Sequence, residues 1–117
     1  MIVTNTRFAD VVVLALKGRL DQTTADDVRT ELAPHLQRCA EGQDHLVLDL
    51  AGVDYVSSAG LRIFMIVGKA LRAERGHIVL CRLQDGVREV FRISGFDRIF
   101  TILPTVVASV AQIEADG

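Results

Sequence analysis

Three short apolar runs, separated by segments with helical spacing, constrain the fold of this chain most strongly. The runs are VVVLALKG (11–18), HLVLDLAGV (45–53) and HIVLCRL (77–83), each rich in valine or leucine and of the length of a buried strand. Between them, apolar residues recur every three or four positions over residues 28–39 and 58–74. Strands that alternate with helices in this way predict an α/β domain with a mostly parallel sheet.

The two ends of the chain complete this pattern. MIVTNTRF (1–8) alternates weakly and predicts an edge strand that forms a hairpin with the first run, and RIFTIL (98–103) predicts a short last strand. A further helix is expected over residues 85–95, and Pro34 predicts a kink or a restart in the first helix. We therefore expect a single domain over residues 1–117, with a mixed sheet of about five strands and helices packed mainly on one side.

The composition excludes several classes of function. Apolar residues make up 50% of the chain and charged residues 24%, and the net charge is −2. The lack of a basic excess argues against binding to nucleic acid. No apolar run reaches the ~18 residues that span a bilayer, and the N-terminus lacks the pattern of a signal peptide. We expect a cytoplasmic protein without direct membrane insertion.

The cysteines and histidines do not have the spacing of a metal site. Cys39 and Cys81 are far apart and are interpreted as two buried thiols in a reducing compartment. His35, His45 and His77 have no partner at helical spacing and no neighbouring cysteine. The sequence predicts neither a bound metal nor a cofactor.

The junction DYVSSAGLR (54–62) carries the main functional signal. Ser57 or Ser58 can cap the helix that follows, and Ala59 and Gly60 allow close approach to its backbone. Free N–H groups and the helix dipole make such a terminus favourable for a phosphate. Two interpretations stay open: a plain helix cap, or a serine whose phosphorylation changes the charge of a docking surface without unfolding it.

The helix after this junction is apolar on its flanks as well as on its central stripe. Its polar edge is narrow, with Arg62, Lys69 and Arg72, and Met65 lies within that edge. Either neighbouring helices bury both flanks, or part of the apolar surface binds a partner. Met65 is the residue most expected to be exposed, because methionine adapts well to a partner.

An enzymatic role for the serines is not expected. A serine nucleophile needs a base and an oxyanion stabiliser, and the order Tyr-Val-Ser-Ser-Ala-Gly does not match the nucleophile elbow. A phosphate-binding loop with Lys-Ser or Lys-Thr is missing as well. We therefore predict that the chain is not an enzyme.

Three segments in order resemble one known family. They are GRLDQTTADD (18–27), HLVLDLAGVDYVSSAGLRIF (45–64) and GHIVLCRLQDGVREVFRISGFDRIF (76–100). Together they resemble the STAS domains of bacterial anti-sigma factor antagonists, the small partners of serine kinases that sequester sigma factors. The resemblance covers nearly the whole chain and implies a single STAS domain.

The family's switch loop commonly reads Asp-Ser-Ser-Gly-Leu. When it is aligned on Gly60, the family's phosphorylated serine falls on Ser58, its aspartate on Ser57 and its second serine on Ala59. Because the aspartate is replaced, the resemblance leaves three options: Ser58 is phosphorylated, Ser57 is phosphorylated, or the switch has been lost. Asp21 matches a family acidic residue near the same loop.

The resemblance also implies partners. The unphosphorylated chain would bind an anti-sigma factor serine kinase, which supplies ATP and Mg²⁺, and a PP2C-type phosphatase would reverse the phosphorylation. The expected contact residues are Asp21, Thr24, Ser57, Ala59, Gly60, Arg62, Met65 and Lys69. The alternative is a STAS regulatory subunit of a stress-sensing or membrane transport complex that does not use a phosphoswitch.

Overall fold

The computed structural model describes residues 1–40 and 44–116, and a five-stranded sheet forms its centre. The strands, in spatial order, are β1 (Ile2–Phe8), β2 (Val11–Leu20), β3 (His45–Val56), β4 (Ile78–Cys81) and β5 (Thr101–Leu103). β1 pairs with β2 in an antiparallel hairpin, and the other neighbours pair in parallel. The predicted mixed, mostly parallel sheet is confirmed.

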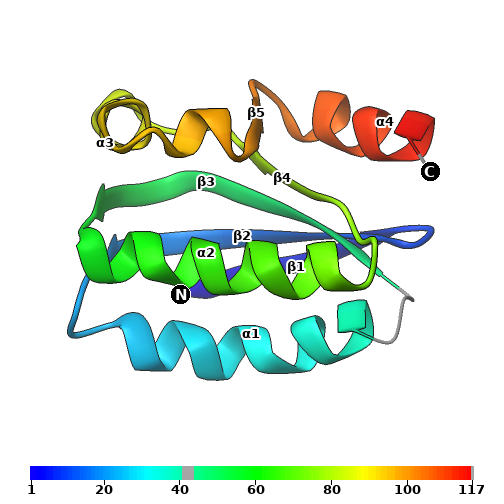
Figure 1. The fold of residues 1–117 in the computed structure, drawn as a ribbon, viewed down its shortest axis with the longest axis horizontal. Helices are drawn as coiled ribbons and strands as arrows, with labels where there is room; N and C mark the ends of the chain where they lie inside the picture. The colour runs from blue at the N-terminus through cyan, green and yellow to red at the C-terminus, as the bar shows by residue number, and fades with distance from the viewer. Residues whose placement is uncertain (41–43, 117) are drawn as a thin grey trace.

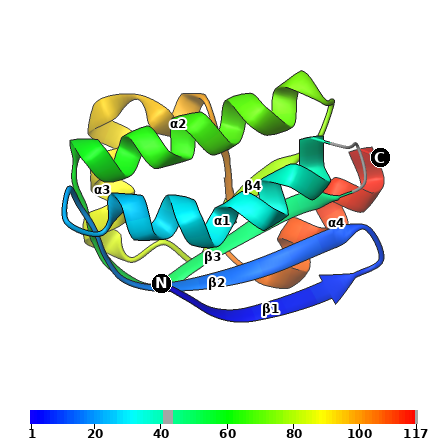
Figure 2. The same cartoon turned by 90° about the horizontal axis from the view of Figure 1, so that it is seen from below.

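Four α-helices and one 3₁₀ helix connect and cover the strands. They are α1 (Ala25–Ala40), α2 (Ser58–Ala73), α3 (Asp85–Ser94), the 3₁₀ helix Phe96–Arg98, and α4 (Val106–Asp116). Figure 1 shows α1 and α2 below the sheet and α4 above it, and Figure 2 shows α1 and α2 side by side. The prediction of helices mainly on one side is confirmed, with α4 as the exception.

The two faces of the sheet have separate cores. On the larger side, buried residues of α1, α2 and α3 share one cluster, in which the Phe64 ring packs edge-to-face against Phe91 with centroids 5.3 Å apart. On the other side, Ile113 of α4 packs with Val11, Val47 and other strand residues. Because β2 and β3 are buried on both faces, their sequences are nearly continuous apolar runs.

α1 continues unbroken through Pro34, so the predicted restart of this helix is wrong. Proline has no N–H, so Pro34 cannot donate the helical hydrogen bond to the Thr30 carbonyl. Both residues are exposed. Water can satisfy that carbonyl, which explains why one proline does not end the helix here.

Candidate functional site at the carboxyl ends of β2 and β3

The two adjacent serines have different structural roles. Ser57 has an extended backbone and is the N-cap of α2, since its Oγ accepts a 3.3 Å hydrogen bond from the Gly60 N–H. Its carbonyl also accepts from the Leu61 N–H at 2.8 Å. Ser58 is the first residue of the helix itself. The choice that the sequence left open is thus resolved in favour of Ser57 as the cap.

Ser58 presents its hydroxyl to solvent. The residue is exposed, and its Oγ has no hydrogen-bond partner within residues 1–40 and 44–116. The backbone N–H groups of Ser58 and Ala59 lie in the first turn of α2, where no carbonyl of the same helix can accept from them. An exposed hydroxyl therefore lies beside free N–H donors at the positive end of the helix dipole.

Close backbone contact holds the start of α2 against the end of β2. The Ser57 N–H donates to the Leu20 carbonyl at 2.9 Å. A Cβ added to Gly60 would lie 2.4 Å from that same carbonyl oxygen. Only glycine fits at this position, so the sequence feature Ala59-Gly60 has a packing cause in addition to any functional one.

Asp21 organises the loop after β2. Its Oδ1 accepts from the Thr23 N–H at 2.9 Å and the Thr23 hydroxyl at 2.6 Å, and also from the Thr24 N–H at 3.2 Å. The Thr24 hydroxyl in turn donates to the Arg19 carbonyl at 2.7 Å. The bonds from Thr23, together with Arg19 and the backbone of Thr24, lower the pKa of Asp21 to about 2. The carboxylate stays ionised at neutral pH.

Arg19 and Tyr55 belong to the same surface, although the sequence did not single them out. The Arg19 Nε lies 3.2 Å from the Asp21 Oδ2, and its guanidinium lies 4.2 Å from the centre of the Tyr55 ring. The two residues are register partners in the parallel pair of β2 and β3. Arg19 and Tyr55 follow predicted apolar runs by one and two positions, so the sequence placed each near a strand end without indicating that they meet.

These residues surround a shallow hollow of about 370 Å³. It is lined by Arg19, Asp21, Gln22, Thr23, Tyr55, Ser57, Ser58 and Ala59. The parallel register of β2 and β3, which pairs Leu20 with Val56, places both loops at one edge of the sheet. Asp21 and Ser58, which the resemblance brought into one site, therefore line the same hollow.

No histidine is among the described residues that line the hollow beside Ser58. His45 begins β3 and His77 precedes β4, at the opposite end of the sheet, where their rings lie 5.0 Å apart. His35 lies ~15 Å along α1 from its first residue. Asp21 is a weak base because of its low pKa. The residues that line the hollow thus include the exposed Ser58 hydroxyl and one ionised carboxylate, and no histidine.

The remaining predicted contact residues lie along α2. Arg62 and Lys69 are exposed, whereas Met65 is half-buried and packs against the core cluster. Neighbouring elements bury much of both flanks: Ile63 and Val67 lie toward α1, and Gly68 meets the ring of Phe100. The exposed apolar surface of α2 is therefore smaller than the sequence suggested.

Two general properties bear on the kind of site. Within the described residues, no three or more His, Cys, Asp and Glu side chains are grouped so that they could hold a metal ion. None of the helices in the described part of the chain has the length and hydropathy of a membrane span.

Most of this chain is similar in sequence to known proteins. The chain is 42% identical over 92 residues to BtrV of Bordetella bronchiseptica, a candidate anti-sigma factor antagonist, covering 79% of this chain and 77% of that protein. It is 32% identical over 96 residues to the anti-sigma-B factor antagonist of Listeria monocytogenes, covering 82% of each.

Among solved structures, the fold matches SpoIIAA in two forms. The unphosphorylated form superposes with a TM-score of 0.76 at 18% identity and covers 96% of each chain. The phosphorylated form from Bacillus gives 0.68 at 18% identity, covering 94% of this chain and 97% of that one. A family model for the STAS domain matches residues 3–109, and this chain belongs to the STAS domain family.

Proposed function

We propose that this chain is an anti-sigma factor antagonist that is switched by phosphorylation of Ser58. The names of its relatives support the first part, since the Listeria protein is named as an anti-sigma-B factor antagonist and BtrV as a candidate anti-sigma factor antagonist. The existence of SpoIIAA in phosphorylated and unphosphorylated forms supports the second. The observation that carries the choice of residue is the exposed Ser58 hydroxyl, which lies beside a helix cap already supplied by Ser57.

In this proposal the unphosphorylated chain binds an anti-sigma factor serine kinase in the cytoplasm and frees the client of that kinase for transcription. The kinase then transfers the γ-phosphoryl group of ATP to the Ser58 Oγ. The new bond joins this Oγ to phosphorus, the bond from phosphorus to the ADP oxygen breaks, and the hydroxyl proton passes to a base of the kinase. ATP and Mg²⁺ belong to the kinase, so the chain itself is a substrate and not an enzyme.

The fold tolerates this modification. A phosphate on Ser58 adds about −1.5 to −2 charges at the positive end of the α2 dipole, where negative charge is favourable. Ser57 continues to cap the helix because its Oγ is not the modified group. The change therefore acts on the charge of the docking surface while the backbone stays in place.

The same geometry disfavours Ser57 as the acceptor. Its Oγ is engaged with the Gly60 N–H, and the residue is half-buried beside the end of β2. A kinase would have to break the cap in order to reach this hydroxyl. With serine in place of the family aspartate at this position, α2 has a neutral cap.

Asp21 and Arg19 complete the proposed docking surface. They line the same hollow as Ser58 and carry opposite charges that are already paired with each other. A phosphate on Ser58 brings negative charge next to the ionised Asp21 and so changes the electrostatics of this surface. A PP2C-type phosphatase removes the phosphate and restores the binding form.

Incubation with the cognate kinase and ATP, followed by intact-mass measurement, tests the site. We expect wild type and Ser57→Ala to gain one phosphate and Ser58→Ala to gain none. Phosphorylation of Ser58→Ala at the wild-type rate would contradict the assignment. If neither serine is modified and the chain instead co-purifies with a membrane transport complex, the proposal of a STAS regulatory subunit replaces this one.

A further inference from the structure

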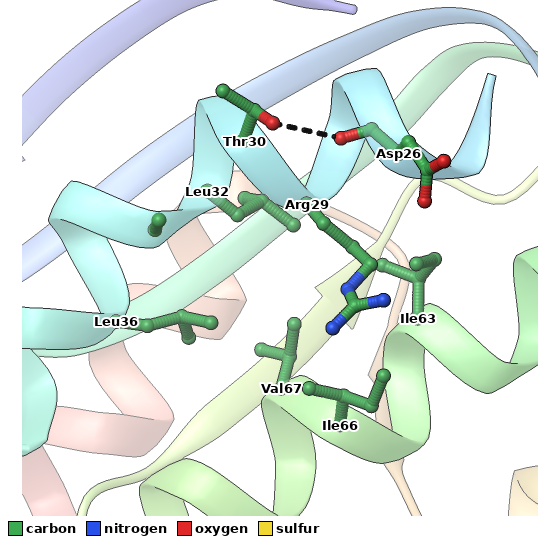
Figure 3. A pocket seen from close by; sticks show the side chains of 9 residues that line it. Asp26, Arg29, Thr30, Leu32, Leu36, Ile63, Ile66 and Val67 are labelled. Carbon is green, nitrogen blue, oxygen red and sulfur yellow. Dashed lines mark hydrogen bonds between the residues drawn. The ribbon is translucent and has the colours of Figure 1, made fainter.

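A groove of about 450 Å³ lies between α1 and α2, beside the proposed phosphorylation site. Its apolar lining comes from both helices: Leu32, Ala33, Leu36, Ile63, Ile66 and Val67. Figure 3 shows the side chains of Leu32 and Leu36 on one wall facing Ile66 and Val67 on the other. Leu32, Ile63 and Val67 belong to the buried core, so the apolar surface that a partner can reach comes mainly from Ala33, Leu36 and Ile66.

Two arginines mark the end of the groove nearest to Ser58. The Arg29 side chain extends from α1 toward Ile63 and Val67 of α2 (Figure 3). Arg29 and Arg62 also line an adjoining hollow of about 290 Å³. Neither arginine forms an ion pair with any residue in the described part of the chain. Asp26 lines both the groove and the adjoining hollow and is the one acidic residue in their linings.

The groove is continuous with the surface around Ser58. Arg29, Ile63 and Ile66 line both the groove and the adjoining hollow. Gln22 and Ala59 line both the adjoining hollow and the one that contains Ser58. A single segment of a partner that lies along the groove would therefore reach the proposed phosphorylation site.

We infer that this groove docks an acidic amphipathic helix of the kinase that phosphorylates Ser58. Apolar side chains of that helix enter between Leu36 and Ile66, and a carboxylate pairs with Arg29 or Arg62. The inference rests on the proposed function for the identity of the partner, and it adds the place and the chemistry of a second contact.

Charge complementarity favours this occupant. Arg29 and Arg62 outnumber the one carboxylate, Asp26, that lines the groove and the adjoining hollow, so this end of the groove attracts negative charge. An apolar stripe on a partner helix supplies the ridge that packs between two helices. Both walls of the groove are helices, whose backbone groups are hydrogen-bonded within the helix, so an extended peptide would find no strand edge to pair with.

The first test measures the affinity of the unphosphorylated full chain for the cognate kinase. Arg29→Glu places a negative charge where the groove is expected to bind a carboxylate, and we expect the Kd to rise by about tenfold or more. Arg88→Glu, at an exposed position on α3, makes the same change in net charge and should bind within about twofold of wild type. Circular dichroism shows whether both variants are folded.

The second test locates the partner directly and does not need a loss of affinity. Ala33→Cys, an exposed position in the groove, is labelled with an environment-sensitive fluorophore. Cys39 and Cys81 are buried and burial raises the pKa of each thiol to about 11, so the label attaches selectively. Ala111→Cys, exposed on α4 across the sheet, is the matched control.

On adding the kinase, we expect a blue shift of the label at position 33 and no shift at position 111. One result would reject the groove alone. If the kinase binds and phosphorylates the chain, but Arg29→Glu binds as tightly as wild type and the label at 33 does not shift, the groove is not the docking site. The proposed function then stands. If wild type neither binds nor accepts phosphate, the proposed function fails and this inference fails with it. The label at position 33 is also tested with lipid vesicles and with oleate. If these shift its fluorescence and the kinase does not, the groove binds a lipid and the inference of a kinase helix is wrong.

Discussion

The backbone N–H of Ser57 donates a 2.9 Å hydrogen bond to the carbonyl of Leu20, and this contact joins the cap of α2 to the last residue of β2. Asp21 follows directly in the chain and Ser58 begins the helix, so one hydrogen bond connects the two loops of the site. The position of the exposed Ser58 hydroxyl relative to the Asp21 loop therefore depends on how closely α2 approaches β2.

Gly60→Ala tests this close approach. The new methyl would lie 2.4 Å from the Leu20 carbonyl oxygen, and the backbone cannot move aside as a flexible side chain would. We expect the free energy of unfolding to fall by about 1–3 kcal/mol in urea titration. Gly86→Ala, where an added Cβ meets nothing within 4 Å, should be neutral or slightly stabilising, and equal behaviour of the two variants would contradict the packing account.

The separate roles of the two serines predict separate effects on stability. Ser57→Ala removes the oxygen that accepts from the Gly60 N–H and should lower the free energy of unfolding by about 1 kcal/mol. Ser58→Ala removes an exposed hydroxyl without a partner among the described residues and should change stability by less than about 0.5 kcal/mol. Thermal unfolding of the two variants checks both values. A larger loss for Ser58→Ala would show that Ser58 is the cap.

The titration of Asp21 reports on the geometry of its loop. Its pKa is lowered to about 2 chiefly by the Thr23 hydroxyl and then by Arg19. We expect carboxyl NMR titration to give a higher pKa for Asp21 in Thr23→Ala than in wild type, and a smaller rise in Arg19→Ala. An unchanged pKa in both variants would mean that neither contact persists in solution.

The ion pairs of Asp44 make the free energy of unfolding depend on pH. This buried carboxylate bonds to Arg7 at 2.9 and 3.1 Å and to Arg38 at 2.7 Å, and these contacts, Arg7 first, lower its pKa to about 2. Because the folded pKa lies below the unfolded value of about 3.9, the contribution is present above about pH 4 and is lost as pH falls toward 2.

Asp44→Asn should therefore flatten the loss of stability between pH 4 and about 2 and lower the free energy of unfolding at neutral pH by about 1–3 kcal/mol. The expected loss is moderate because Arg7 and Arg38 are about half exposed and remain hydrated without their partner. Urea titrations at several pH values give both quantities. An identical pH profile for wild type and variant would exclude Asp44 as the source of acid sensitivity.

Periodicity in the sequence was sufficient to predict the sheet and its helices. Strands buried on both faces, such as β2 and β3, leave a strong apolar signal. The same reasoning could not predict that α1 continues through Pro34, because the effect of a proline depends on whether water reaches the carbonyl that it leaves without a partner.

The candidate site was predicted in part. Ser57, Ser58 and Asp21 carry local signals of capping and loop chemistry, and the family resemblance brought them together. Arg19 and Tyr55 came into the site only through the register of two parallel strands, which no local pattern specifies. The groove depends on how α1 packs on α2, and spacing within either helix cannot reveal it.

The affinity of the cognate kinase for the two forms of this chain decides whether Ser58 is a switch. Wild type is purified unphosphorylated and phosphorylated on Ser58, and the Kd of each form is measured by titration calorimetry with ADP and Mg²⁺ present. We predict that phosphorylation weakens binding by about tenfold or more, because charge is added beside Asp21 in the docking surface. Equal affinities of the two forms would contradict it.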